Sequence, residues 1–184
     1  MNVKEAISER RAYRSLKPVK ITKELVRDFA ECAKLSASCF NNQPWRYVFV
    51  YNQKKLKEMH LALSSGNEWA KSASMFIAVF SKEQNDCVIS DRRYYLFDTG
   101  MATAFIILRA TELGFVAHPI AGYSPRKVRE ILNIPDTMNV IALIIVGKHS
   151  EKISPLLSDS QIEAEHKRPE RIPLKKFVYI NQYK

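Results

Sequence analysis

Three arginines stand close together near the start of the chain, at Arg10, Arg11 and Arg14. A guanidinium presents N–H donors in a rigid planar fork that matches a phosphate group, and its charge does not titrate near neutral pH. Residues four apart share one face of a helix, so Arg10 and Arg14 would grip one dianion if this segment is helical, with Arg11 pointing elsewhere unless the turn opens after it. The alternative is a solvated basic end of an N-terminal helix.

A second stretch, residues 36–45, reads SASCFNNQPW and lies between an apolar helix pattern and an apolar strand pattern. Asparagine and glutamine side chains carry donors and acceptors that can match the edge of a heteroaromatic ring. Pro44 favours an extended Gln43, and the small residues allow a ligand to approach the backbone. The alternative is an ordinary surface loop. Together with the arginines, this loop indicates a site for a flat aromatic cofactor that carries a phosphate.

Composition bounds the class of protein. A length of 184 residues with 46% hydrophobic and 26% charged residues is typical of one globular domain. The net charge of +10 would suit a nucleic acid or an anionic small molecule. The basic residues are spread along the chain, without an RNA-recognition signature, a zinc finger or a polybasic block, so a small anionic ligand is favoured and nucleic-acid binding is kept as an alternative.

The sequence predicts a cytoplasmic protein that does not enter a membrane. No apolar stretch reaches the length needed to cross a bilayer, and the first residues lack the apolar core of a signal peptide. The three cysteines, Cys32, Cys39 and Cys87, show no CxxC spacing and cannot all pair. We therefore expect reduced thiols, with a packing role for Cys39.

Hydrophobic periodicity predicts alternating helices and strands. Helices are expected over residues 3–10, 22–35 with Thr22 as N-cap, 54–63, 91–113 and from Ser124 to about 132; strands are expected over 47–51, 75–80 and 140–146. Residues 101–108 are apolar on nearly every face, which places them deep in the fold or in a subunit interface. The order favours an α/β or α+β sandwich, without a GxGxxG sequence or a P-loop.

These residues resemble the nitroreductase family of FMN-dependent oxidoreductases over nearly the whole chain. Residues 10–14 are similar to its Arg-Arg-Ser-x-Arg sequence, and residues 37–45 to its Ala-Pro-Ser-x-x-Asn-x-Gln-Pro-Trp loop. A long apolar helix ending near Gly114, a Pro-Ile-Ala-Gly turn at residues 119–122 and a basic arm at residues 168–174 follow in the family's order.

The resemblance implies an α+β fold: a three-layer sandwich with a mostly antiparallel sheet between helices, in an intertwined homodimer. It divides the chain into an FMN-binding domain over residues 1–150 and a C-terminal arm over residues 151–184, which docks on the domain or on the partner subunit. The residues implied to bind FMN include some from the second subunit (Ser38, Cys39 and Asn41); the full set is Arg10, Arg11, Arg14, Ser38, Cys39, Asn41, Gln43, Asn67, Pro119, Ile120, Ala121, Gly122, Arg168 and Arg171.

The implied activity is ping-pong transfer of hydride from NAD(P)H through the flavin to an electron-poor acceptor such as a nitroaromatic or a quinone. The flavin carries the chemistry, so no catalytic side chain and no metal is expected, and His118 is expected to be structural. The alternatives are a flavin-binding sensor or carrier with little turnover, a relative with different flavin chemistry, and the basic nucleic-acid-binding protein.

Three features depart from the family pattern. Ala12 replaces the usual serine beside the phosphate, and Ala121 stands where many members have a larger or acidic residue. The segment before the long helix is short, so we expect a substrate pocket that is open or covered differently from that of larger members.

Overall fold

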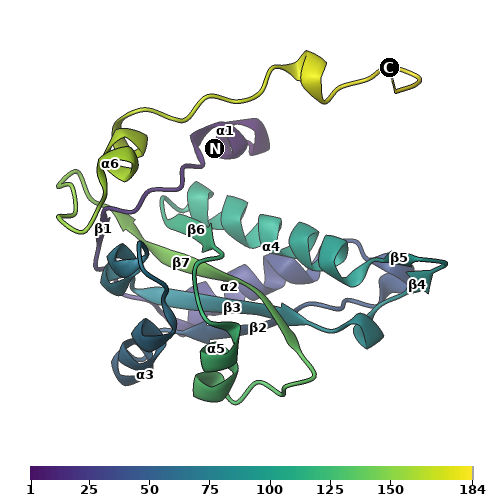
Figure 1. Ribbon diagram of the computed structural model, residues 1–184, viewed down its shortest axis with the longest axis horizontal. Coiled ribbons are helices and arrows are strands. Elements are labelled where there is room, and N and C mark those ends of the chain that lie inside the picture. Colours follow the sequence, from purple (N-terminus) through teal and green to yellow (C-terminus); the bar gives the residue numbers. More distant parts are fainter. Residues whose placement is uncertain (184) are drawn as a thin grey trace.

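A five-stranded antiparallel sheet forms the centre of the computed structural model, which describes residues 1–183 (Figure 1). The strand order is β1-β7-β3-β2, and β6 also pairs with β7. The strands are β1 (Leu16–Lys17), β2 (Arg46–Val50), β3 (Met75–Ser81), β6 (Val116–Ile120) and β7 (Asn139–His149). The expected mostly antiparallel sheet is confirmed.

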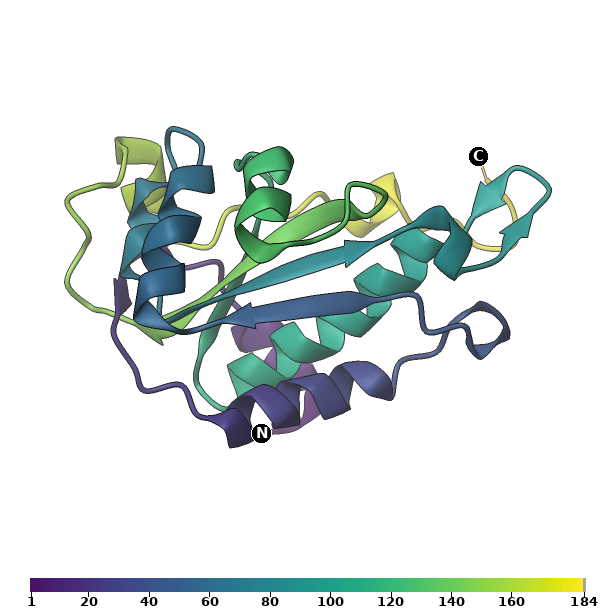
Figure 2. The same cartoon turned by 90° about the horizontal axis from the view of Figure 1, so that it is seen from below.

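Helices cover both faces of this sheet, which gives the three layers visible in Figure 2. One face carries α2 (Lys23–Lys34) and α4 (Tyr95–Glu112), and the other carries α3 (Gln53–Met59) and α5 (Pro125–Leu132). Alternate residues of a strand point to opposite faces, so Ile77 packs in the first of these cores and Phe76 in the second. Strand β3 reads as a continuous apolar run because both of its faces are buried.

The helix boundaries follow local signals in the sequence. The Oγ1 atom of Thr22 accepts a hydrogen bond from the backbone N–H of Leu25 at 3.2 Å, and Ser124 caps α5 in the same way. Gly114, which follows the C-cap Leu113 of α4, has φ +70°, the left-handed conformation that commonly ends a helix. These expected caps are confirmed.

Two expected helices are shorter than predicted. The segment predicted as helix from residue 91 forms part of a hairpin, β4 (Val88–Ile89) and β5 (Arg92–Arg93), whose turn places Ser90 at φ 59°. Helix α4 therefore begins at Tyr95. The helix predicted over residues 54–63 ends at Met59 and continues as a 3-10 turn. After α3 the apolar spacing continues because the 3-10 turn also buries Ala62, whereas the exposed residues before α4 pair as a hairpin.

The expectation of three reduced cysteines is wrong for two of them. Cys39 and Cys87 form a disulfide with their Cα atoms 6.2 Å apart, and Cys32 is free. Disulfide pairing depends on distance in space, which spacing along the sequence does not report. Cys39 is therefore a cross-link rather than a packing residue.

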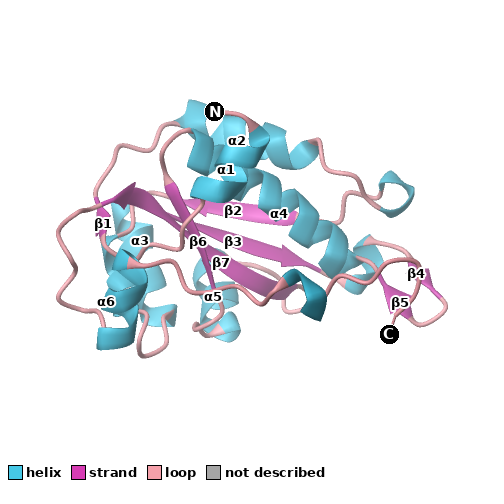
Figure 3. Cartoon of the chain, turned by 90° about the horizontal axis from the view of Figure 1, so that it is seen from above, coloured by secondary structure: helices cyan, strands magenta, loops and turns pink. Residues whose placement is uncertain are grey.

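The two termini lie apart (Figures 2 and 3), although the segments next to them in sequence meet on one side of the molecule. Helix α1 (Val3–Glu9) packs on α4 (Figure 3), and α6 (Asp159–His166) lies beside the segment that follows α1. Residues 171–183 are exposed, and the last residue of the predicted arm, 184, lies outside the described part of the chain. Within the described residues, every helix is too short or too polar to cross a bilayer.

Candidate functional site

A cavity of about 170 Å³ lies between the segment that follows α1 and the segment that follows α6. Its lining contains all five arginines that the sequence singled out for a phosphate, together with three uncharged residues: Arg10, Arg11, Ala12, Arg14, Ala164, Arg168, Pro169 and Arg171. Residues more than 150 positions apart in the chain thus converge on one small basic hollow.

The arginines do not converge by sharing a helix face. Helix α1 ends at Glu9, and Arg10 leaves it with φ −53° and ψ 117°. The helical alignment of Arg10 with Arg14 is therefore not formed, because the backbone leaves the helix at Arg10. In the irregular backbone after α1, all three side chains reach the same cavity.

Arg11 connects this segment to the end of α6. Its Nη2 atom donates to the carbonyl oxygens of Ala164 at 2.7 Å and Glu165 at 3.2 Å. A cation is favourable there, because the last carbonyls of a helix carry a partial negative charge. The guanidinium also lies 4.6 Å from the ring centroid of Tyr13.

Glu165 holds the backbone of the Arg10–Arg14 segment, and it is not among the residues predicted from the sequence. Its side chain is buried, and its two carboxylate oxygens accept the backbone N–H groups of Arg14 at 2.7 Å and Ser15 at 3.1 Å. The Nε2 atom of His149 lies 3.8 Å from the same carboxylate. No local pattern in α6 marks Glu165, because its partners lie about 150 residues earlier in the chain.

The arginine cavity brings like charges together, and the described residues that line it include no acidic side chain. Burial lowers the pKa of Arg10, and the neighbouring Arg168, Arg171 and Arg11 lower it further. Like charges destabilise one another, whereas an anion among them would restore favourable pairing. The donor set therefore fits a phosphate-bearing ligand by its chemistry.

A neutral histidine and a tryptophan lie behind Arg14. The Trp69 ring stacks on His118 at 4.8 Å, and the Arg14 guanidinium lies 6.0 Å from the Trp69 ring centroid. Burial lowers the pKa of His118 to about 4, so its neutral ring donates from Nδ1 to the carbonyl oxygen of Tyr13 at 3.1 Å. Among residues 1–183, the buried Nε1–H of Trp69 has no acceptor.

Asn67 and Gly122 meet at the end of β6. The Nδ2 atom of Asn67 donates to the Gly122 carbonyl oxygen at 3.1 Å, and a Cβ atom at Gly122 would collide with this side-chain amide. Gly122 is thus a residue whose missing side chain makes room for Asn67. Pro119 and Ile120 are the last residues of β6, and an exposed Ala121 follows them.

Gln161 of α6 donates to the carbonyl oxygen of Gly66 at 3.0 Å, next to Asn67. Helix α6 therefore contacts both the Asn67 turn and the Arg10–Arg14 segment. Two predicted groups of residues, the arginines and the Asn67–Gly122 pair, are connected through this helix and through Trp69.

The remaining predicted residues lie in a loop at the opposite end of the molecule from the arginine segment (Figure 2): Ser38, Cys39, Asn41 and Gln43. Ser38 Oγ accepts the backbone N–H of Gln43 at 3.0 Å, and the Gln43 amide donates to the Asn41 carbonyl at 3.3 Å. These contacts within the loop support its turn. A single chain does not bring it to the arginine cavity.

Comparison with known proteins agrees with these features. A model described as the Nitroreductase family matches residues 7–88 and 64–148. A protein of Archaeoglobus fulgidus, provisionally named NADH dehydrogenase/NAD(P)H nitroreductase, is 30% identical over 148 residues, covering 77% of this chain and 82% of its own length. The oxygen-insensitive NADPH nitroreductase of Helicobacter pylori is 24% identical over 176 residues, covering 76% of this chain and 83% of its own.

A solved crystal structure of an oxidoreductase containing FMN superposes with a TM-score of 0.84 at 26% identity, covering all 100% of this chain and 94% of that one. The family match spans most of the chain, and the relatives are oxidoreductases by name. The chain therefore belongs to the nitroreductase family.

Proposed function

We propose that this chain is an FMN-dependent oxidoreductase that passes hydride from NAD(P)H to an electron-poor acceptor of the nitroaromatic or quinone class. The observation that carries the proposal is the cavity lined by five arginines, which helix α6 connects to the turn that holds the Asn67–Gly122 pair. A neighbour of the same fold that contains FMN supports the choice of cofactor. When bound, the flavin supplies the redox chemistry.

In this proposal the arginines hold the phosphate of the cofactor. Arg10 and Arg14 supply charged donors, and Arg168 and Arg171 close the cavity from the arm. Arg11 is already engaged with the carbonyl oxygens at the end of α6, so it fixes the shape of the cavity as well as adding charge. Ala12 contributes no hydroxyl donor, which leaves the guanidiniums as the main side-chain donors.

Asn67 and the backbone of residues 119–122 are proposed to lie beside the edge of the isoalloxazine ring. The Asn67 amide is held by Gly122, so one of its polar groups is oriented before a ligand arrives. The small exposed Ala121 leaves space for an acceptor. Neutral His118 supports this region from behind through Trp69 and adds no positive charge.

The proposal includes a homodimer, because one chain holds only part of the proposed site. Ser38, Cys39, Asn41 and Gln43 would reach the cofactor of the partner subunit. The surface offers an apolar face for such an interface: Leu35, Phe97 and Phe105 are 78%, 64% and 42% exposed. An apolar hollow of about 530 Å³ formed by α1, α2 and α4 lies on the same side.

An absorbance spectrum of the purified protein tests the cofactor, with mass analysis of whatever is released on denaturation. We expect flavin bands and FMN at about one per chain. Oxidation of NADH and NADPH is then followed with a quinone and with a nitroaromatic as acceptor. A colourless protein that takes up no added FMN would overturn the proposal, whereas bound FMN without turnover would favour a flavin sensor or carrier.

A further inference from the structure

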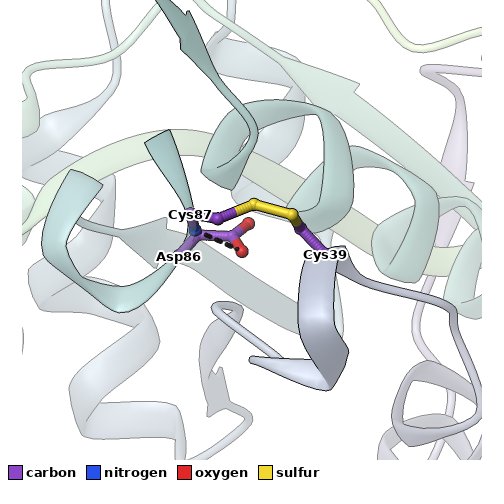
Figure 4. Close-up of side chains that lie close together, drawn as sticks. All are labelled: Cys39, Asp86 and Cys87. Carbon is purple, nitrogen blue, oxygen red and sulfur yellow. Dashed lines mark hydrogen bonds between the residues drawn. A yellow bond between two sulfur atoms is a disulfide. The ribbon is translucent and has the colours of Figure 1, made fainter. Parts of the chain in front are cut away.

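The disulfide between Cys39 and Cys87 joins two segments 48 residues apart in sequence (Figure 4). Cys39 begins the 3-10 turn Cys39–Asn41, and Cys87 directly precedes β4. The bond therefore connects the 38–43 loop to the hairpin β4–β5. Few other interactions connect them: Asn42 Nδ2 donates to an Asp86 carboxylate oxygen at 3.3 Å.

The loop has a backbone that needs outside support. Phe40, Asn41 and Gln43 have φ values of 47°, 58° and 50°, in the left-handed region that residues with side chains avoid. The Phe40 side chain is 83% exposed, so within the chain it does not anchor the loop by packing. Besides the hydrogen bonds within the loop, the disulfide and the hydrogen bond from the Cys39 N–H to Asp98 at 2.6 Å tie the turn to the rest of the chain.

Acidic groups lie next to the two sulfurs. Within the described chain, one buried carboxylate oxygen of Asp86 has no hydrogen-bond partner, and its other oxygen accepts the Cys87 N–H at 2.9 Å. Burial and the nearby Asp86 raise the pKa of the Asp98 carboxyl. A negative charge on either sulfur would be unfavourable beside these acidic groups.

We propose that Cys39 and Cys87 form a reversible redox latch. The disulfide holds the 38–43 loop in the shape that retains the flavin, and reduction of the disulfide releases the loop. The effect on flavin binding rests on the proposed function, whereas the latch itself rests on the geometry alone. Both cysteines are partly exposed, so a small thiol can reach them.

The exchange is a two-electron step with a low-molecular-weight thiol as reductant. Its thiolate attacks one sulfur of the pair, the Sγ–Sγ bond breaks, and the leaving sulfur takes a proton. A second thiol then displaces the protein sulfur from the mixed disulfide. The net change converts two small thiols into their disulfide and the protein disulfide into two protein thiols, and the reverse reaction closes the latch.

The first experiment measures the latch without reference to flavin. The protein is equilibrated with dithiothreitol or with oxidised glutathione, alkylated, and mapped by peptide mass. We expect Cys39 and Cys87 to be protected only in the oxidised sample, and Cys32 to be alkylated in both after denaturation. Trypsin should also cut the exposed hairpin at Arg92 and Arg93 faster after reduction. Alkylation of all three cysteines in the oxidised sample would overturn the proposal.

The second experiment measures the dissociation constant for FMN in wild type with and without dithiothreitol, in Cys87→Ser, and in Cys32→Ser as the matched control. We expect reduction and Cys87→Ser each to weaken FMN binding by at least about fivefold, because a released loop must be ordered again on binding. Cys32→Ser should match the oxidised wild type. Equal affinities for oxidised and reduced wild type would overturn the effect on flavin. Absence of FMN binding in both states, with the alkylation and trypsin results as expected, would overturn the proposed function and leave the latch standing.

Discussion

The carboxylate of Glu165 accepts the backbone N–H of Arg14 at 2.7 Å and also that of Ser15 at 3.1 Å. One buried side chain of α6 thus fixes the direction in which the arginine segment leaves the core. A carboxylate with two such donors is well satisfied, because charge-assisted hydrogen bonds are short and strong. Glu165 is a positioning residue for the proposed phosphate site.

We expect Glu165→Gln to lower the free energy of unfolding by about 1–3 kcal/mol, since the amide can accept only one of the two backbone N–H groups. FMN binding should weaken by about tenfold as the arginines lose their fixed backbone. Glu163→Gln, at an exposed position of the same helix, is the matched control. Urea unfolding and FMN titration measure the two effects, and wild-type affinity in Glu165→Gln would contradict the positioning role.

The double variant Arg10→Ala with Arg14→Ala should reduce FMN affinity by at least about a hundredfold, because it removes two charged donors from the cavity. The dimer should survive, since neither residue lines the apolar hollow between α1, α2 and α4. Fluorescence titration and sedimentation measure the two properties. Arg126→Ala, on the surface of α5, is the control; tight FMN binding by the double variant would sink the assignment of the phosphate site.

Stability should depend on the protonation of His118. Its pKa is about 4 in the folded chain against an ordinary 6.5, so the unfolded state takes up the proton first. Above pH 6.5 the neutral ring makes its full contribution to the free energy of unfolding, which is about 3 kcal/mol. This contribution is lost as the pH falls through 4.

His118→Gln should make the free energy of unfolding depend less on pH in this acidic range, because the glutamine amide can donate to the Tyr13 carbonyl oxygen without titrating. The free energy of unfolding is measured from about pH 7 to about pH 4 in wild type, in His118→Gln and in His166→Gln, whose side chain is exposed. A slope in His118→Gln equal to that of wild type would show that another group controls the acid sensitivity.

Gly122→Ala should destabilise the protein by about 1–3 kcal/mol, because the new Cβ atom collides with the Asn67 amide. In an Asn67→Ala background the same change should have a much smaller effect, which a double-mutant cycle measures as coupling. Gly100→Ala is the control, since a Cβ atom there meets nothing within 4 Å. Additive effects at positions 67 and 122 would contradict the close approach of these two residues.

The strands and caps could be predicted because their causes are local. The apolar run of β3, the Thr22 cap and Gly114 after α4 each depend on neighbouring residues alone. The predicted start of α4 at residue 91 is wrong, because a hairpin with its turn at Ser90 interrupts a pattern that is typical of a helix.

The sequence by itself determined the family resemblance, the order of the elements and the arginine residues that the proposal assigns to a phosphate. Only the tertiary structure decided how those arginines meet, that Glu165 supports them, and that Cys39 pairs with Cys87. The physical reason is that caps, turns and periodicity act over a few residues, whereas these contacts join segments tens to more than a hundred residues apart. Such pairs come together only when the packed sheet and helices bring distant parts of the chain within bonding distance.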